Sequence, residues 1–217
     1  MAGWLSGLRD KSKSSQMDAP IASIRYVVLD TELTSLEQRS NRLLSVGAIA
    51  MQGPSIELGS QFYRVVNPRC AIPAEGIVIH GLRAQEVQSG EEPARALDDL
   101  SRFVEGAVLV GHFAEIDLKI LRKEMQQTGH KLDNLAVCTA RAHHWILRQG
   151  PYSEELPVQL GNLDLGTLSK FYGLEPHDAH HALADAFQTA RVWQKMLHRL
   201  QQYRVGNLRK LMKVAGV

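Results

Sequence analysis

Cysteine is scarce in this sequence, which contains only Cys70 and Cys138 among its 217 residues. The two lie far apart and neither belongs to a C-x-x-C pair, so the spacing typical of a disulfide framework or a zinc site is missing. Long apolar runs are missing too, because no window approaches the roughly 18 apolar residues that a membrane-spanning helix needs. The first residues lack the apolar core and cleavage site of a secretion signal. We therefore expect a cytoplasmic protein with reduced thiols and no membrane partner.

Acidic residues are absent from the last part of the chain. No Asp or Glu follows Asp185, whereas seven Lys and Arg do, so the rest of the chain has a net charge of −5 within a total of +2. This asymmetry suits a polyanionic partner at the basic end. A helix with one solvated basic face is an equally ordinary explanation. The composition otherwise is that of a globular protein large enough for one substantial core.

The first half of the chain is strand-like. Residues 24–30 form a compact, β-branched apolar run, and residues 42–51 and 59–66 follow with no helical pattern between them. Turn-forming residues separate the second and third segments. Successive strands without a crossover pair as antiparallel neighbours. We therefore expect three antiparallel strands at the start of the fold.

The second half alternates strands with helices. Its helical segments are expected at 91–106, 114–129, 140–149, 163–173, 181–203 and 207–214, and its strands at 107–113 and 135–139. Alternation of this kind favours a parallel sheet covered by helices. The whole pattern predicts an α/β fold with a mixed sheet, three antiparallel strands followed by parallel ones. We expect a flexible leader at 1–20, one domain at 21–204 and a short basic C-terminal helix at 205–217.

Four carboxylates stand at positions that favour a metal site. Asp30 and Glu32 end the first strand and share a face, because alternate residues of a strand point the same way. Two solvated acids in a turn are the competing explanation. Asp117 lies on the first turns of the helix at 114–129, where it could instead favour the positive end of the helix dipole. Asp185 sits within an apolar run, where a buried acid needs a cation. A divalent ion shared by distant carboxylates meets that need.

The position of Asp117 depends on how its helix packs. We expect Ile116, Ile120 and Leu121 to point inward, which would leave Asp117 between this apolar stripe and the edge of the sheet. A carboxylate there can reach the end of the first strand. The sequence thus predicts that acids from three distant segments meet.

Three segments in order carry a resemblance to a known family. The stretches VLDTELTSL, GHFAEIDLKIL and HHALADA resemble the three motifs of the DEDDh 3'-5' exonucleases, most closely the proofreading epsilon subunits of bacterial DNA polymerase III. IVIHGL and LDLGTLSKFYGL add to the likeness, which covers roughly residues 24–200. The resemblance implies a ribonuclease H-like fold and release of nucleoside 5'-monophosphates from single-stranded 3' ends.

The resemblance also assigns roles to residues. It implies that Asp30, Glu32, Asp117 and Asp185 bind two Mg²⁺ or Mn²⁺ ions in a two-metal mechanism. It implies that His180, five residues before the last acid, is the general base. The adjacent His181 then becomes a residue of the helix start or a supporting neighbour of the site.

Several positions are expected to contact the terminal nucleotide. The family usually has Thr-Thr-Gly after the acids and Asn after Gly-His, and this chain departs from both patterns. Phe113 stands in place of the Asn and either stacks on a terminal base or packs under the site. Ile79 and His80 resemble residues that line the nucleotide pocket, although a structural turn is the alternative. The candidates for substrate binding are Thr31, Leu33, Thr34, Ile79, His80 and Phe113.

Other functions remain open at this stage. The motifs do not separate DNA from RNA, so an exoribonuclease that trims short RNA is an alternative. A non-catalytic module that binds nucleic acid or regulates is a second. A zinc protein using His143 and His144 is disfavoured, because adjacent residues of a helix diverge by about 100°. The expected partners are single-stranded nucleic acid and a polymerase or repair protein.

Overall fold

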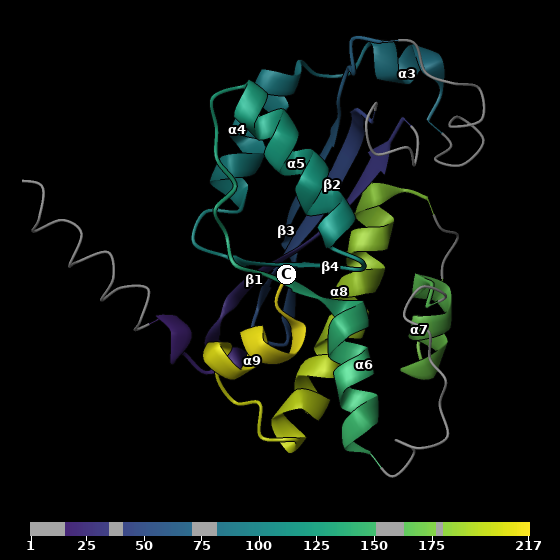
Figure 1. The fold of residues 1–217 in the computed structure, drawn as a ribbon. Helices are drawn as coiled ribbons and strands as arrows, with labels where there is room; N and C mark the ends of the chain where they lie inside the picture. Colours follow the sequence, from purple (N-terminus) through teal and green to yellow (C-terminus); the bar gives the residue numbers. More distant parts are fainter. Residues whose placement is uncertain (1–15, 35–40, 71–81, 151–162, 177–179) are drawn as a thin grey trace, which may run out of the picture.

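The fold is built on a mixed five-stranded sheet in the order β3-β2-β1-β4-β5. Figure 1 shows this sheet with helices packed around it. In this computed structural model the described residues are 16–34, 41–70, 82–150, 163–176 and 180–217. The strands are β1 (Arg25–Leu33), β2 (Leu43–Gln52), β3 (Ser55–Val65), β4 (Val108–Gly111) and β5 (Ala136–Cys138). β1, β2 and β3 pair antiparallel, whereas β4 pairs parallel to β1 and to β5. The predicted fold class is confirmed.

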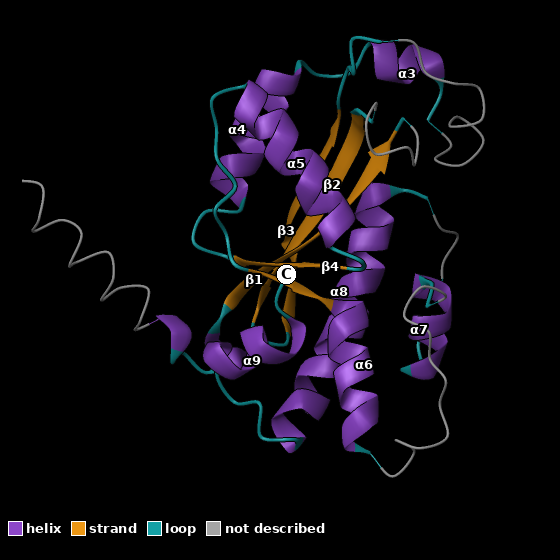
Figure 2. Ribbon diagram, viewed as in Figure 1, coloured by secondary structure: helices purple, strands orange, loops and turns teal. Residues whose placement is uncertain are grey.

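Helices cover the sheet, as the colouring in Figure 2 shows. After the 3-10 turn η1 (Ile21–Ser23), they are α3 (Ala84–Gln88), α4 (Pro93–Phe103), α5 (Glu115–Gln127), α6 (Thr139–Gln149), α7 (Leu165–Phe171), α8 (Ala182–Gln202) and α9 (Leu208–Ala215). The predicted helical segments of the second half agree with α4 to α9 to within a few residues at each end. Their apolar spacing therefore identified these elements correctly.

The long helix α8 lies across β1, β2 and β3 and contributes much of the core. Its Trp193 is fully buried and meets the ring of Tyr26 on β1 edge to face, with the centroids 5.7 Å apart. Tyr26 therefore points toward α8, and so do the alternate residues of β1 that follow it. The α5 helix meets the opposite face of β1, where it contacts Thr31. Residues from both faces of β1 thus converge on its carboxyl end.

The last residues of the chain belong to the main core. Val205, Leu208, Leu211 and Ala215 are all buried, and α9 packs on α6 and β5. The Val217 N–H donates to the Ala136 carbonyl beside β5. The segment 205–217 therefore has no core of its own, and it covers one edge of the sheet.

Residues at the start of the described chain contact the same C-terminal segment. Pro20 bridges to Asn207, and Asp18 pairs with Arg209 at 3.1 Å. The predicted leader at 1–20 therefore includes residues that contact α9 and its entrance. Residues 1–15 lie outside the described structure.

One packing prediction is wrong. Ile116 was expected to point inward, but half of its side chain is exposed. Ile120 and Leu121 are buried as expected, and Asp117 and Leu118 take the inward positions of the first turn. The apolar stripe therefore begins one residue later than expected, and it carries Asp117 into the fold.

In the part of the chain that the structure describes, none of the helices combines the length and the apolar character that a membrane span requires.

Candidate active site

Asp30 and Glu32 lie at the carboxyl end of β1, beyond the ladder that joins this strand to β4. That ladder spans only Tyr26–Val28 of β1, so the last residues of the strand extend past it. The two acids share the face that α8 covers, and Glu32 is only 9% exposed. The carboxyl ends of parallel strands are the usual position of binding sites in α/β folds. The strand thus presents two carboxylates where the sheet opens.

Asp185 reaches these acids from the first turn of α8. One carboxylate oxygen of each of Asp30, Glu32 and Asp185 lies within 4.8 Å of those of the other two. The close approach depends on Gly47, which is the β2 neighbour of Asp30. A Cβ at Gly47 would lie 2.2 to 2.4 Å from backbone atoms of α8 at Ala182 and Leu183. The absent side chain therefore lets the helix start rest on the sheet beside the acids.

Asp117 lies next to this group but is bound differently. Its Oδ1 accepts hydrogen bonds from the Thr31 N–H at 3.1 Å and from the Thr31 hydroxyl at 2.6 Å. The carboxylate thus occupies the free edge of β1 past the end of β4. It is not one of the three acids within 4.8 Å of one another. The structure therefore gathers three predicted ligands tightly and anchors the fourth to the strand between two of them.

Repulsion within the cluster favours a cation. Burial, and then the charges of Asp117, Asp185 and Glu32, raise the pKa of Asp30 well above its usual range. Burial with the charges of Asp185 and Asp117 raises the pKa of Glu32 to about 8. Burial raises the pKa of Asp117 to about 7, despite the lowering effect of its hydrogen bonds from Thr31. A divalent ion would offset both causes, and an all-oxygen donor set suits Mg²⁺ or Mn²⁺.

The two histidines before α8 differ in what they do. The backbone N–H groups of His180 and His181 both donate to Asp185 Oδ2, at 2.8 and 3.2 Å. His181 is the N-cap of α8, and its Nδ1 accepts from the Ala184 N–H at 3.4 Å. His180 has a φ of 77°, a strained value for a residue with a side chain, and its ring is exposed. The carboxylate of Asp185 therefore fixes the backbone that presents both rings.

The candidates for substrate binding fall in three groups. Thr31 and Thr34 are buried and use their hydroxyls internally, Thr31 toward Asp117 and Thr34 as acceptor for the Arg42 N–H at 3.0 Å. Leu33 and Phe113 are half-buried and pack against the core, and Phe113 has a φ of 52°. Ile79 and His80 lie outside the described residues. The Phe113 ring also meets that of His112, with the centroids 4.6 Å apart.

Sequence reasoning missed two residues that shape the site. Gly47 appeared only as part of an apolar strand, although a glycine inside a strand often marks a close backbone approach. Tyr63 of β3 stacks on the His181 ring, with the centroids 4.7 Å apart and the planes at 22°. No local sequence pattern predicts the contact between Tyr63 and His181, because β3 and the start of α8 are far apart in the sequence.

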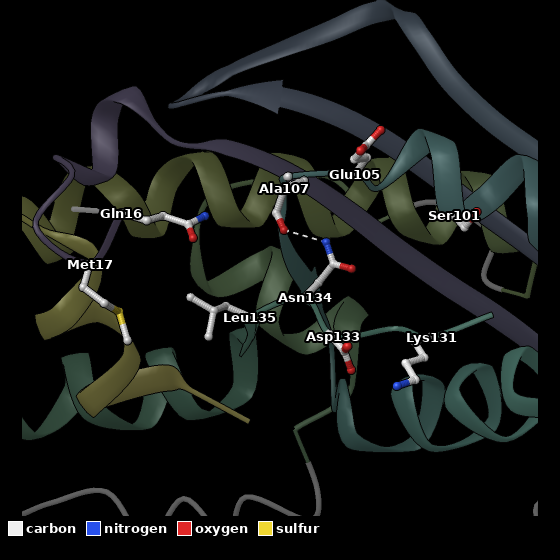
Figure 3. A pocket seen from close by; sticks show the side chains of 10 residues that line it. Gln16, Met17, Ser101, Glu105, Ala107, Lys131, Asp133, Asn134 and Leu135 are labelled. Carbon is white, nitrogen blue, oxygen red and sulfur yellow. Dashed lines mark hydrogen bonds between the residues drawn. The ribbon is translucent and has the colours of Figure 1, made fainter. Parts of the chain in front are cut away.

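A cavity of about 550 Å³ lies elsewhere, near the amino ends of β4 and β5 (Figure 3). It is lined by residues around Ala107 and Leu135 together with Gln16 and Met17. Asn134 reaches across it and donates to the Ala107 carbonyl at 2.8 Å. This cavity lies at the end of the parallel strands opposite to the acids, so it forms no part of the candidate active site.

Comparisons with known proteins agree with this geometry. The family model RNase_T, described as exonuclease, matches residues 27–193. The DNA polymerase III subunit epsilon of Aquifex aeolicus is 24% identical, over 95% of this chain and 98% of that protein. The PolC-type DNA polymerase III of Caldanaerobacter subterraneus subsp. tengcongensis is 26% identical over 87% of this chain, which spans only 13% of that protein.

A solved structure gives the same fold. Exonuclease I of E. coli in complex with a dT13 oligonucleotide matches with a TM-score of 0.71 and 18% identity, over 84% of this chain and 43% of that one. The chain therefore spans less than half of this structural neighbour and a small part of the PolC-type relative.

Proposed function

Because the chain belongs to the RNase_T family of exonucleases, we propose that it removes nucleoside 5'-monophosphates from the 3' end of single-stranded DNA. The observation that carries the proposal is the convergence of Asp30, Glu32 and Asp185, acids from two distant segments, within 4.8 Å. The names of its relatives support this substrate, since one is a polymerase III epsilon subunit and the structural neighbour was solved with dT13.

Asp30, Glu32 and Asp185, with Asp117 beside them, would bind the divalent ions on which this family depends. Bound in pairs, such ions acidify the attacking water and stabilise charge on the leaving 3' oxygen. Asp30 lies within the cluster, and the charges of all three other acids raise its pKa. Asp117 is oriented by Thr31, which fixes the direction of its second oxygen.

His180 would accept the proton of the attacking water. Its backbone is tied to Asp185 and strained, and a strained residue held by its neighbours is typical of catalytic sites. The exposed ring leaves it accessible to solvent and substrate. His181 has a structural role instead, because its Nδ1 caps α8 and its ring stacks on Tyr63.

The test uses 5'-labelled DNA and RNA oligomers of one sequence, single- and double-stranded, with Mg²⁺ or Mn²⁺. We expect single-stranded DNA to shorten from its 3' end one nucleotide at a time. The Asp30→Ala variant should fold and give no product. Shortening of RNA alone would replace the proposal with an exoribonuclease. Oligomer binding by the wild-type chain without any product would favour the non-catalytic module.

A further inference from the structure

A line of basic side chains runs along α8 away from the acid cluster. Arg191, Lys195 and Arg199 follow one another every four residues, which places them on one side of the helix, about one per turn. His198 lies beside the last of them. No acidic residue occurs in α8 after Asp185. We call these four side chains the α8 basic stripe.

The cations of the stripe are available to a ligand. Lys195 and His198 are exposed, and Arg191 and Arg199 are half-exposed. Arg191 donates only to the side chain of Gln188, at 2.9 Å, and the described residues offer no ion pair to any of the stripe's cations. Their charge is therefore not neutralised within the described structure.

The far end of the stripe is hollowed and aromatic. A cavity of about 360 Å³ is lined by Pro54, Tyr172, Gln194, Lys195, His198 and Arg199, none of them acidic. The Arg199 guanidinium lies over the rings of Phe171 and Tyr172, 5.3 and 5.1 Å from their centroids. The Phe171 side chain is 44% exposed. Cations beside exposed aromatic rings are the features that bind single-stranded nucleic acid.

We propose that the α8 basic stripe binds the backbone of the substrate strand upstream of its 3' end, an inference that rests on the proposed function. The stripe begins at Arg191 in the middle of α8, six residues after Asp185 and about 9 Å further along the helix axis. Lys195 lies ten residues after Asp185, about 15 Å along the helix axis. A strand leaving the active site over α8 would meet one cation per helical turn, matching its regular series of phosphates. The exposed ring of Phe171 beside Arg199 favours this occupant over an acidic peptide, because nucleic-acid bases stack on aromatic rings.

The experiment compares Lys195→Glu with Lys213→Glu in the full chain. Both side chains are exposed in the basic C-terminal region, and both substitutions change the net charge equally. Substrates are a single-stranded 15-mer and a dinucleotide, whose only phosphodiester is the scissile one. We expect Lys195→Glu to raise KM for the 15-mer about tenfold and to reduce its salt slope by about 0.7 per lost phosphate contact. Dinucleotide turnover should not change, and Lys213→Glu should behave as wild type.

Three results would overturn the inference. The first is that Lys195→Glu and Lys213→Glu have equal effects on the 15-mer. The second is that Lys195→Glu lowers turnover of the dinucleotide and of the 15-mer equally. The third is that Lys195→Glu leaves binding of the 15-mer unchanged but weakens binding of a poly-glutamate peptide. Failure of the proposed function is distinguishable, because it would leave the wild-type chain inactive on both substrates. Binding of the labelled 15-mer, followed by fluorescence anisotropy with Ca²⁺, would then still compare the two variants.

Discussion

At the scale of single residues, the acid cluster sets how the protein responds to pH and to metal. Glu32 is nearly buried among like charges, and its pKa is raised to about 8. A carboxyl whose folded pKa exceeds its unfolded value stabilises the fold below the unfolded pKa and loses that contribution as the pH rises through the folded pKa. For Glu32 this contribution to stability is therefore lost between about pH 4.5 and about pH 8, the unfolded and folded pKa values of its carboxyl group.

The metal-free chain should therefore melt at lower temperature as the pH rises from 5 to 8.5. Glu32→Gln should remove part of this dependence and be the more stable protein at pH 8.5. A difference of 1 kcal/mol corresponds to about 2–4 °C for a chain of this size. Mn²⁺ should raise the melting temperature more at pH 8 than at pH 5, because protons compete with the metal for the carboxylates. Thermal melts with and without EDTA measure both effects, and a flat profile would contradict the repulsion argument.

The two adjacent histidines should separate in a kinetic test. His180→Ala should lower kcat by at least about 100-fold, the lower limit for losing a general base. His181→Ala removes an N-cap and a ring stack, so it should cost about 1 kcal/mol of stability and much less activity. Single-turnover rates on a single-stranded oligomer, paired with urea unfolding, compare the variants. Equal losses of activity would remove His180 from its assigned role.

At the scale of elements, the site depends on how closely α8 approaches β2. The strand carries Gly47 opposite Asp30, and the helix backbone occupies the space of its missing side chain. A methyl group there must displace the start of α8, since the neighbouring atoms are backbone. The contact is thus the physical link between strand position and Asp185.

Gly47→Ala should accordingly weaken metal binding along with the fold. We expect a loss of about 1–3 kcal/mol in unfolding free energy and a clear drop in Mn²⁺ affinity, because Asp185 moves away from Asp30 and Glu32. Gly59→Ala is the matched control, since a Cβ at Gly59 of β3 meets nothing within 4 Å. Calorimetric Mn²⁺ titration measures the affinity. Unchanged affinity in Gly47→Ala would show that the site tolerates a shifted helix.

At the scale of the whole molecule, the C-terminal residues pack into the main core. Leu208 and Leu211 are fully buried, and Gly216 and Val217 pair with β5. The basic charge of this end therefore lies on elements that are part of the core.

Removal of residues 205–217 should destabilise the protein severely, because it exposes the α6 and β5 surfaces that α9 covers. Leu211→Ala alone should cost about 2–5 kcal/mol. Urea unfolding followed by far-UV circular dichroism measures both. Lys213→Glu provides the control for surface change on α9. Full stability of the chain ending at residue 204 would contradict this expectation and support the predicted boundary there.

The sequence by itself determined the five strands, the helices α4 to α9 and the identity of the acids, but it did not predict α3. The spacing of apolar residues, every two residues in a strand and every three or four in a helix, is a local property of the sequence. It therefore located β1, α5 and α8 without information on the elements that pack against them. Asp30 and Glu32 were identified as acids at the end of an apolar strand, and Asp185 as an acid within an apolar run. The resemblance to the exonuclease motifs then grouped them as one site. The prediction from apolar spacing was wrong at Ile116, because it placed the start of the buried face of α5 one residue too early.

Only the tertiary structure decided how these parts meet. Thr31 and Asp117 are 86 residues apart, and their hydrogen bonds depend on β1 extending past the end of β4. Gly47 matters only because α8 rests on it, and α9 belongs to the core only because β5 leaves an edge to cover. Contacts of this kind are set by the relative placement of whole elements. No periodicity in the chain encodes that placement, since each element would show the same pattern against any apolar partner.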